Sequence, residues 1–395
     1  MSLKSVLVAI TLVAVISDYL LHPFYPHFFE MRFGVADPKQ VGFYFSAICF
    51  VVMIAFPLWA QVSKKVPELR ILVYTQFAAG ILGIGCFFVT SYTLFWALSL
   101  CMIAFKGSYL LVYPYILKIT SKENHVNTIG LLSVIVHFGS VAGAVLGGMV
   151  LEFIHPAYIF LVMATGDFIQ MGASLYLLKR ERPTLSADDD SNAGPTKATG
   201  GFKGFVLKIG VITLILYSSD FIIRPFFVRY WESLSIYDSK IISGLVYAIP
   251  ALVALIALWS NRRRKGSRGL YDGIITAMLL GLAGLMLQGY PSAVVVFLGR
   301  LVYGWGIFQA MVRFDALLFG LSTPGSYATD YSKIHFFQNL GVLLASFSSG
   351  LLIGKYSLQS PFLVAITGFT LCISLYYFTI KARSMAPRPL TKITQ

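Results

Sequence analysis

Charged residues are scarce in this chain of 395 residues, and that scarcity excludes most soluble folds. Asp, Glu, Lys and Arg make up only 12% of the sequence, whereas a soluble domain has about 25%. Hydrophobic residues make up 57%, and the mean hydropathy is +0.75. The composition therefore predicts a protein that lies within a lipid bilayer.

Several chemical signatures are also absent. The four cysteines lie in apolar runs without paired spacing, which predicts neither a disulfide framework nor a zinc cluster. The sequence has no phosphate loop of the form GxxxxGK followed by Ser or Thr, and no HExxH or GxSxG motif. We therefore expect no metal, no cofactor, no direct use of ATP and no enzymatic activity. A channel or an intramembrane enzyme stays open as an alternative, although neither pore-lining rings nor a catalytic constellation is evident.

The apolar residues occur in runs long enough to cross a membrane as helices. A helix needs about 20 residues to span the hydrocarbon, whereas the strands of a barrel alternate over about ten. The fold class expected is an all-α polytopic membrane protein with twelve transmembrane helices. The runs cover roughly 5–25, 40–61, 71–90, 92–117, 129–151, 157–178, 204–228, 241–260, 271–289, 292–319, 332–353 and 360–380.

The Lys and Arg residues fall mainly on one side of these spans. With the N-terminus in the cytoplasm, that side carries Lys64, Lys65, the segment 179–203, the run Arg262–Arg268 and the C-terminal tail. We therefore expect a multi-pass protein of the cell inner membrane with both ends in the cytoplasm. The net charge of +14 then follows from topology, so that no nucleic-acid partner is expected. The first run is interrupted by Asp18 and has no small-residue cleavage site, and we expect a retained helix.

A polar segment divides the chain in two. Residues 180–203 are rich in Asp, Ser, Gly, Pro and Lys, a composition that cannot bury a core. The expected organisation is a six-helix bundle over 1–179, a cytoplasmic linker over 180–203, a second six-helix bundle over 204–381 and a cytoplasmic tail over 382–395.

The two bundles carry an internal repeat. The segment SDYLLHPF starts at Ser17 and SDFIIRPF starts at Ser219, so that Asp18 matches Asp220 with an offset of 220 − 18 = 202. The same offset carries Glu30 onto Glu232, Gly139 onto Gly341 and Gly148 onto Gly350. Because each copy has an even number of spans, the repeats are parallel, and a binding site is expected between them near the middle of the membrane.

Over nearly its whole length the chain resembles the major facilitator superfamily, and within it the twelve-helix drug:proton antiporter group. The resemblance rests on Pro23–Pro26, on Pro57–Trp59, and on the stretch Gly139–Gly148, which is similar to the antiporter motif GxxxGPxxGG with Ala144 in place of proline. The resemblance implies a gating role for Gly139, Gly143, Gly147 and Gly148, although glycines spaced by four also simply allow close helix packing. After the second span, Lys64 stands where the family has an aspartate that latches the halves, and we assign it no role.

Ionisable residues within spans are costly, at roughly 2.5–3.5 kcal/mol each, and are candidates for function. Asp18 and Asp220 occupy equivalent places on helices that, by resemblance, line the central cavity, and they are the proposed proton-coupling residues. His22, four residues after Asp18, could titrate with it. Asp220 could instead form a structural ion pair with Arg224 at i,i+4 spacing.

Three buried cations against two carboxylates suggest an anionic ligand. Lys106, Arg224 and Arg300 are expected to face one cavity between the halves. Neutral hydrogen bonds could come from Tyr109, Tyr113, Gln309, Gln338 and Asn339, and Arg313 and Asp315 are expected in gating contacts between the halves.

The expected function is secondary active transport by alternating access. We favour proton-coupled export of a small organic anion or zwitterion, such as a carboxylate metallophore of the siderophore type, by a monomer. Proton-coupled import of a similar solute and export of hydrophobic drugs are the alternatives. The expected partners are the small-molecule substrate, protons and the lipid bilayer.

The orientation is testable by labelling. Cysteines placed at Ser186 and Ser267 should resist a membrane-impermeant thiol reagent in intact cells and react after permeabilisation, because both positions are expected in the cytoplasm. A cysteine at Tyr237, in an expected outer loop, serves as the positive control. Labelling of position 186 or 267 from outside would contradict the predicted orientation.

Overall fold

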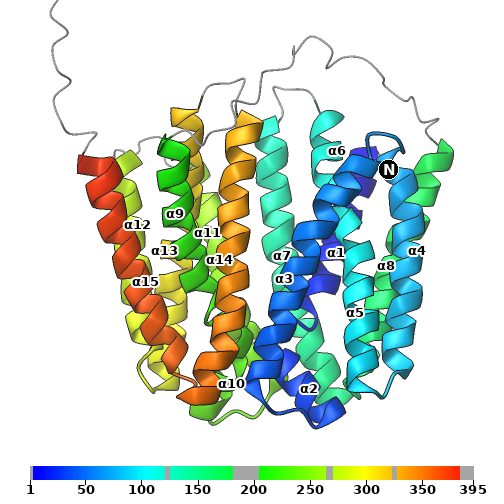
Figure 1. Cartoon of the computed structure of the whole chain (residues 1–395), viewed down its shortest axis with the longest axis horizontal. Helices are drawn as coiled ribbons and strands as arrows, with labels where there is room; N and C mark the ends of the chain where they lie inside the picture. The colour runs from blue at the N-terminus through cyan, green and yellow to red at the C-terminus, as the bar shows by residue number, and fades with distance from the viewer. Residues whose placement is uncertain (1–2, 121–124, 181–203, 264–269, 323–326, 383–395) are drawn as a thin grey trace, which may run out of the picture.

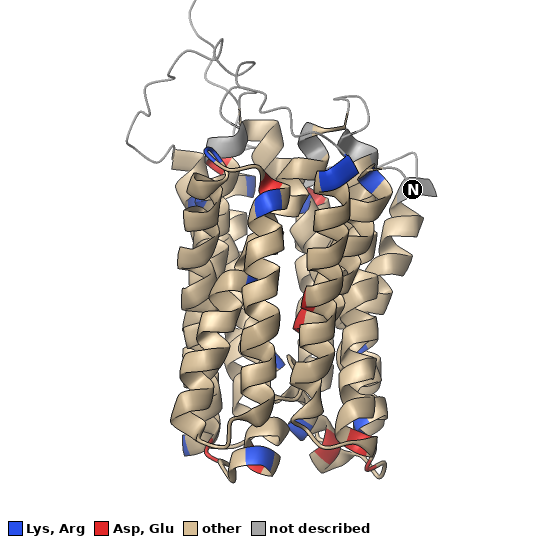
Figure 2. Cartoon of the chain, turned by 90° about the vertical axis from the view of Figure 1, so that its right-hand side faces the viewer, with Lys and Arg blue, Asp and Glu red and all other residues tan. Residues whose placement is uncertain are grey.

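The computed structural model describes residues 3–120, 125–180, 204–263, 270–322 and 327–382, and this part of the chain is helical throughout its regular structure. The long helices lie side by side (Figure 1). Lys, Arg, Asp and Glu gather at their two ends, with few between (Figure 2). The linker expected over 180–203 and the tail after Ala382 lie outside the described residues, except for Arg180, which ends a helix.

The helices follow the predicted runs. Eleven described segments are long and apolar enough to cross a membrane, and α1, at 17 residues, occupies the first predicted run. The all-α architecture is therefore confirmed. The elements are α1 (Leu3–Tyr19), α2 (Tyr25–Phe33), α3 (Pro38–Val62), α4 (Glu68–Phe88), α5 (Tyr92–Lys106), η1 (Gly107–Leu111), α6 (Val112–Lys118), α7 (His125–Phe153), α8 (Tyr158–Arg180), α9 (Gly204–Phe221), η3 (Arg224–Phe226), α10 (Phe227–Leu234), α11 (Lys240–Arg263), α12 (Leu270–Gln288), α13 (Ala293–Leu321), α14 (Tyr327–Lys355), α15 (Ser360–Tyr376) and η5 (Tyr377–Lys381).

A proline ends the first helix of each repeat. Pro23 follows the end of α1 and Pro225 follows the end of α9, and a proline lacks the N–H that a continuing helix needs. The chain then turns into the short helices α2 and α10 on the face opposite the N-terminus (Figure 1). As a result, Asp18 and Asp220 each lie in the last turn of a long helix.

Two helix pairs hold the halves together. We call the described residues up to Arg180 the first half and those from Gly204 the second half. Each half packs mainly on itself, and the main contacts between halves are α7 with α11 and α3 with α14.

Glycines permit these contacts, because a Cβ on them would collide with the backbone of the neighbouring helix. A Cβ on Gly148 would lie 2.6 Å from the carbonyl oxygen of Lys240, and one on Gly350 would lie 2.4 Å from that of Pro38. The repeat offset relates Gly148 to Gly350, and both serve the junction between halves. Within the first half, a Cβ on Gly143 or Gly147 would collide with backbone atoms of α1 or the turn after it. Gly139, Gly143 and Gly147 therefore pack α7 against this segment, and a gating role for them stays a prediction.

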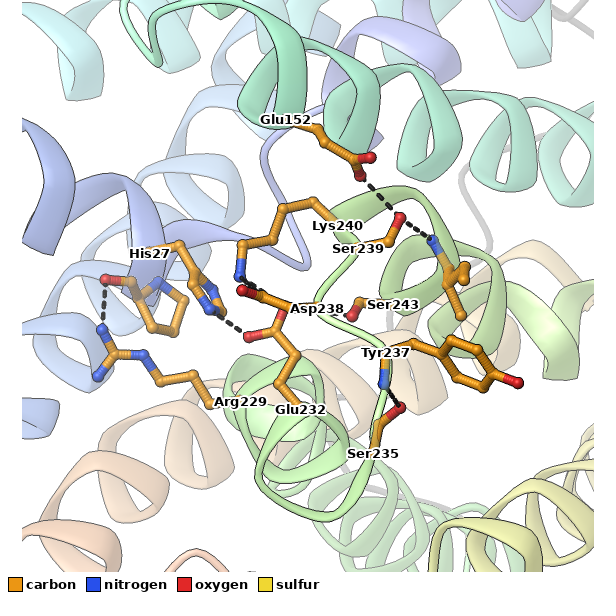
Figure 3. A network of polar contacts seen from close by, with 12 residues as sticks. His27, Glu152, Arg229, Glu232, Ser235, Tyr237, Asp238, Ser239, Lys240 and Ser243 are labelled. Atoms are coloured by element: carbon orange, nitrogen blue, oxygen red, sulfur yellow. Dashed lines mark hydrogen bonds and ion pairs between the residues drawn. The ribbon is translucent and has the colours of Figure 1, made fainter.

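Polar contacts reinforce the junction at the face opposite the N-terminus (Figure 3). The Nε2 of His27 lies 2.5 Å from Glu232, and Arg229 pairs with Glu30. Because 229 − 27 and 232 − 30 both equal 202, these two ion pairs are repeat equivalents of one another. We call these four residues the latch. Lys240 and Ser243 donate to the second oxygen of Glu232, at 3.0 and 3.1 Å.

A further contact joins α7 to the start of α11. The Glu152 carboxylate accepts a hydrogen bond from the Ser239 hydroxyl at 2.8 Å and another from the backbone N–H of Ile241 at 3.1 Å. A carboxylate at the N-terminus of α11 also interacts favourably with the helix dipole. The halves are therefore closed at this face.

Cross-linking tests this closure. With cysteines at Glu152 and Ser239, a disulfide or a short bifunctional thiol reagent should join α7 to α11 in most molecules, because the native side chains are in hydrogen-bond contact. The joined protein should lose the transport expected from the sequence, and reduction should restore it. The two single-cysteine variants are the controls, and full transport by the joined protein would show that this junction never opens.

Candidate functional site

A cavity lies between the halves and is lined by both. It has a volume of about 280 Å³, and Tyr19, His137 and Ser140 contribute from the first half. The second half contributes most of the wall from α9, η3, α11 and α13, including Asp220, Arg224, Tyr247, Arg300 and Tyr303. The position agrees with the expectation of a site between parallel repeats, and the size suits a small polar molecule.

Asp220 is a fully partnered carboxylate. It pairs with Arg224 one turn later, and the Tyr303 hydroxyl donates to its other oxygen at 2.5 Å. The guanidinium of Arg224 also lies 4.4 Å from the centre of the Phe221 ring. The i,i+4 ion pair considered from the sequence is therefore present, and Asp220 and Arg224 together carry no net charge.

Arg300 is buried without such a counter-charge. Its guanidinium donates to the backbone carbonyls of Val246 and Tyr247, and lies 4.0 Å from the centre of the Phe227 ring. Gln288 is a more distant acceptor at 3.5 Å. Within the described ranges no carboxylate forms an ion pair with Arg300. Backbone carbonyls and aromatic rings supply only partial negative charge, so the cavity carries a formal charge of about +1 from these groups.

Lys106 does not line this cavity. It is buried in the first half, where its Nζ lies 3.5 Å from Asp18 and 3.3 Å from Asp167 and donates to the Ser17 hydroxyl at 2.9 Å. The expectation of three cations against only two carboxylates is therefore wrong. Asp167 on α8 is a third carboxylate, fully buried. Asp167 lies inside an apolar run, as Asp18 does, so the sequence carries the signal for this third carboxylate.

His22 does not pair with Asp18. Its Nδ1 lies 2.9 Å from the hydroxyl of Tyr247, across the junction between halves. The physical reason is that α1 ends at Tyr19, so the four-residue helical spacing from Asp18 to His22 does not hold. His22 instead links the turn after α1 to the wall of the cavity.

The remaining residues named from the sequence lie outside the cavity wall. Gln309 exchanges hydrogen bonds with Asn261, and Arg313 donates to the backbone and side-chain oxygens of Gln309. Gln338 is buried, whereas Tyr113 and Asn339 are exposed and Tyr109 is half-buried. Arg313 and Asp315 form no ion pair with each other among the described contacts, as their two-residue spacing predicts. The roles proposed for these residues stay predictions.

The cavity is lined by four tyrosines that the sequence did not single out, namely Tyr19, Tyr217, Tyr247 and Tyr303. Tyr303 lies one turn after Arg300 and reaches Asp220, while Tyr19 and Tyr247 come from opposite halves. Aromatic residues are abundant in this chain, at 15%, and most serve packing. Only the three-dimensional arrangement separates these four from the others.

Comparisons with known proteins extend these observations. A family described as Major Facilitator Superfamily matches residues 7–323. The nucleoside transporter NupG has a TM-score of 0.76 at 14% identity, over 98% of this chain and 100% of that one. A bacterial homologue of the human lysosomal transporter Spinster scores 0.74 at 12% identity, over 95% of each chain. The human organic anion transporter MFSD10 scores 0.67 at 16% identity, over 95% of this chain and 100% of that one. A search of curated protein sequences found no significant match.

The Asp220 site has a measurable energetic consequence. Asp220→Asn leaves Arg224 without its counter-charge and should destabilise the folded protein by up to about 3 kcal/mol, the lower end for breaking a buried pair, because Arg224 is partly exposed. Tyr303→Phe removes one hydrogen bond and should cost about 1 kcal/mol.

Unfolding of the purified protein in detergent measures both effects. Arg224→Gln in the Asp220→Asn background should recover part of the loss, because no unpaired charge remains. A double variant whose loss equals the sum of the two single losses would show that the pair is not coupled.

Proposed function

Because the chain belongs to the major facilitator superfamily and is a multi-pass membrane transporter, we propose that it couples protons to the export of a small organic anion or zwitterion. A carboxylate metallophore is one substrate of this kind. We place it in the cell inner membrane as a monomer, with both ends in the cytoplasm, as the distribution of Lys and Arg favours.

The substrate class rests on one observation, which is Arg300. Its guanidinium is buried in the wall of the cavity and has no carboxylate partner among the described residues. A guanidinium has five N–H donors in a planar fork that matches a carboxylate. An anionic group bound in the cavity would supply the missing negative charge, and Arg224 lies on the same wall to assist.

The volume of the cavity also sets an upper limit on the size of the proposed substrate. A volume of about 280 Å³ and the surrounding tyrosines favour a compact molecule with polar groups and one apolar or aromatic surface. Two of the solved structures that resemble this chain are a nucleoside transporter and an organic anion transporter. At identities below 25% these likenesses support the fold alone, so the argument for an anion stays with Arg300.

Alternating access would use the junctions already described. Closure at the face opposite the N-terminus by the latch, and close packing at Gly148 and Gly350, support a state in which that face is shut. With the N-terminus in the cytoplasm, the shut face is the outer one. Opening it would require both ion pairs of the latch to separate together, because the repeat relates them.

Two alternatives use the same fold. Import of a similar solute would need the same site, with the solute and the proton moving in the same direction instead of in opposite directions. Export of a hydrophobic drug would need no cation in the cavity, and the buried Arg300 argues against it because an unpaired charge disfavours an apolar ligand.

The Arg300 assignment predicts selective loss of acidic ligands. Arg300→Gln should weaken binding of a carboxylate ligand by roughly 1.5–3 kcal/mol, the range for a charge-assisted hydrogen bond, and leave a neutral ligand unaffected. Ligand-induced thermal stabilisation of the purified protein, measured over a panel of small carboxylates and neutral compounds, gives both values.

Lys355→Gln is the control, because Lys355 is an exposed cation of the second half that lies outside the cavity wall. It should leave the whole panel unchanged. If Arg300→Gln binds carboxylates as strongly as the wild-type protein does, the proposal of an anionic substrate is wrong, and export of a hydrophobic drug is favoured instead.

A further inference from the structure

A second charged centre lies in the first half, apart from the cavity. It consists of Asp18 on α1, Lys106 at the end of α5 and Asp167 on α8. Lys106 lies between the two carboxylates, 3.5 Å from Asp18 and 3.3 Å from Asp167. We call these three residues the triad. Gly166 brings α8 close to α1 at this level, since a Cβ on it would lie 3.6 Å from Ser17.

The triad holds more negative than positive charge. Two carboxylates and one ammonium sum to a formal charge of −1 in a site where the Lys106 and Asp167 side chains are 6% and 0% exposed. Neither oxygen of Asp167 has a hydrogen-bond partner within the part of the chain that is described. A buried carboxylate in this condition is costly, and adding one proton removes the excess charge.

Protons have a route to the triad through Asp18. Its side chain is 34% exposed, whereas that of Asp167 is fully buried. Tyr19, the residue after Asp18, lines the cavity between the halves. A proton from water would therefore reach Asp18 first, and the flexible ammonium of Lys106 is placed to shift toward whichever carboxylate remains ionised.

The second half has no equivalent centre. The repeat offset of 202 carries Lys106 onto Phe308 and Asp167 onto Phe369, and only Asp18 has a charged counterpart, Asp220. Asp220 is satisfied by Arg224 and Tyr303, and no second carboxylate shares a described ion pair with it. Asp18 and Asp220 are thus equivalent in sequence but not in charge environment.

From this geometry we infer that the triad is the proton site of the transporter, that it binds one proton shared between Asp18 and Asp167, and that Lys106 stays charged between them. This deepens the proton coupling proposed above and adds Asp167 as a proton-binding residue. Protonation takes one H⁺ from water, forms an O–H bond on a carboxylate oxygen and brings the triad from −1 to neutral. Release returns the same H⁺ to water. The other groups near Asp18 are the phenols of Tyr19, Tyr25 and Tyr109.

Infrared difference spectroscopy measures this directly, with protons as the only ligand. Acidification of the purified, lipid-reconstituted wild-type protein should produce, beside the C=O bands of its exposed carboxyl groups, one further C=O band from the protonated triad. Asp167→Asn and Asp18→Asn should each lose that band, because one carboxylate and Lys106 form a neutral pair that has no excess charge to titrate. Lys106→Gln should move the midpoint of the band to higher pH, because removal of the cation makes the shared proton harder to release.

Asp220→Asn is the matched control and should keep the band. Asp167→Glu should restore it, which separates loss of the proton site from loss of the fold. Absence of the band in wild type, or an unchanged band and midpoint in Asp167→Asn, would overturn the inference. The measurement uses no substrate, so a wrong substrate class would leave it standing. Conversely, if Asp167→Asn carries out proton-driven transport at the normal rate, the triad is not the proton site, whereas the proposed function still stands.

Discussion

Charge inside hydrocarbon needs a partner, and this constraint organises the structure. The chain places few charged residues between the ends of its helices (Figure 2), since each unpaired one is costly. Among the described residues, six of the charged groups in the interior gather at two centres. One is Asp220 with Arg224 and nearby Arg300, and the other is the triad of Asp18, Lys106 and Asp167. The rest of the fold is apolar packing that brings these groups together.

The two centres carry opposite excess charge. The centre in the second half has a formal excess of +1 from Arg300, and the triad in the first half has an excess of −1, so that the two centres together are neutral. Each centre therefore carries one charge that no opposite charge within the same centre neutralises. A proton would satisfy the triad and a substrate anion would satisfy Arg300, which gives proton coupling and anion binding one electrostatic origin.

The repeat explains the junction between the halves better than it explains the centres. His27 and Glu30 match Arg229 and Glu232, and the offset turns one inter-half ion pair into two. Gly148 and Gly350 likewise serve equivalent junctions. The interior centres instead differ between halves, because Lys106 and Asp167 are matched by phenylalanines. The repeat symmetry is thus kept at the junction between the halves and lost at the two charged centres.

Much of the fold was predictable from local features. Runs of apolar residues define the spans, because length and hydropathy are local properties, and the SDYLLHPF and SDFIIRPF segments identify the repeat. The division of the chain at 180–203 stays a prediction. The ion pair of Asp220 with Arg224 was also within reach, since both lie on one helical face.

Pairing between distant segments was not predictable in the same way. Lys106 meets Asp18 and Asp167 from two other helices, 88 and 61 residues away by the differences 106 − 18 and 167 − 106. No spacing in a single sequence encodes that meeting. His22 was placed wrongly for a different reason, because the helix ends three residues before it. A charge count that included Asp167 would have predicted the balance of the interior but not its division into two centres.

Coupled flux tests the central claim most directly. In proteoliposomes containing the wild-type protein and an internal pH indicator, small carboxylates are added one at a time without any imposed gradient. The account predicts that at least one of them moves protons across the membrane in the direction opposite to its own movement, and that an imposed pH gradient then drives that compound uphill. Uphill movement of neutral hydrophobic compounds alone, with no carboxylate moving and no proton flux, would contradict it.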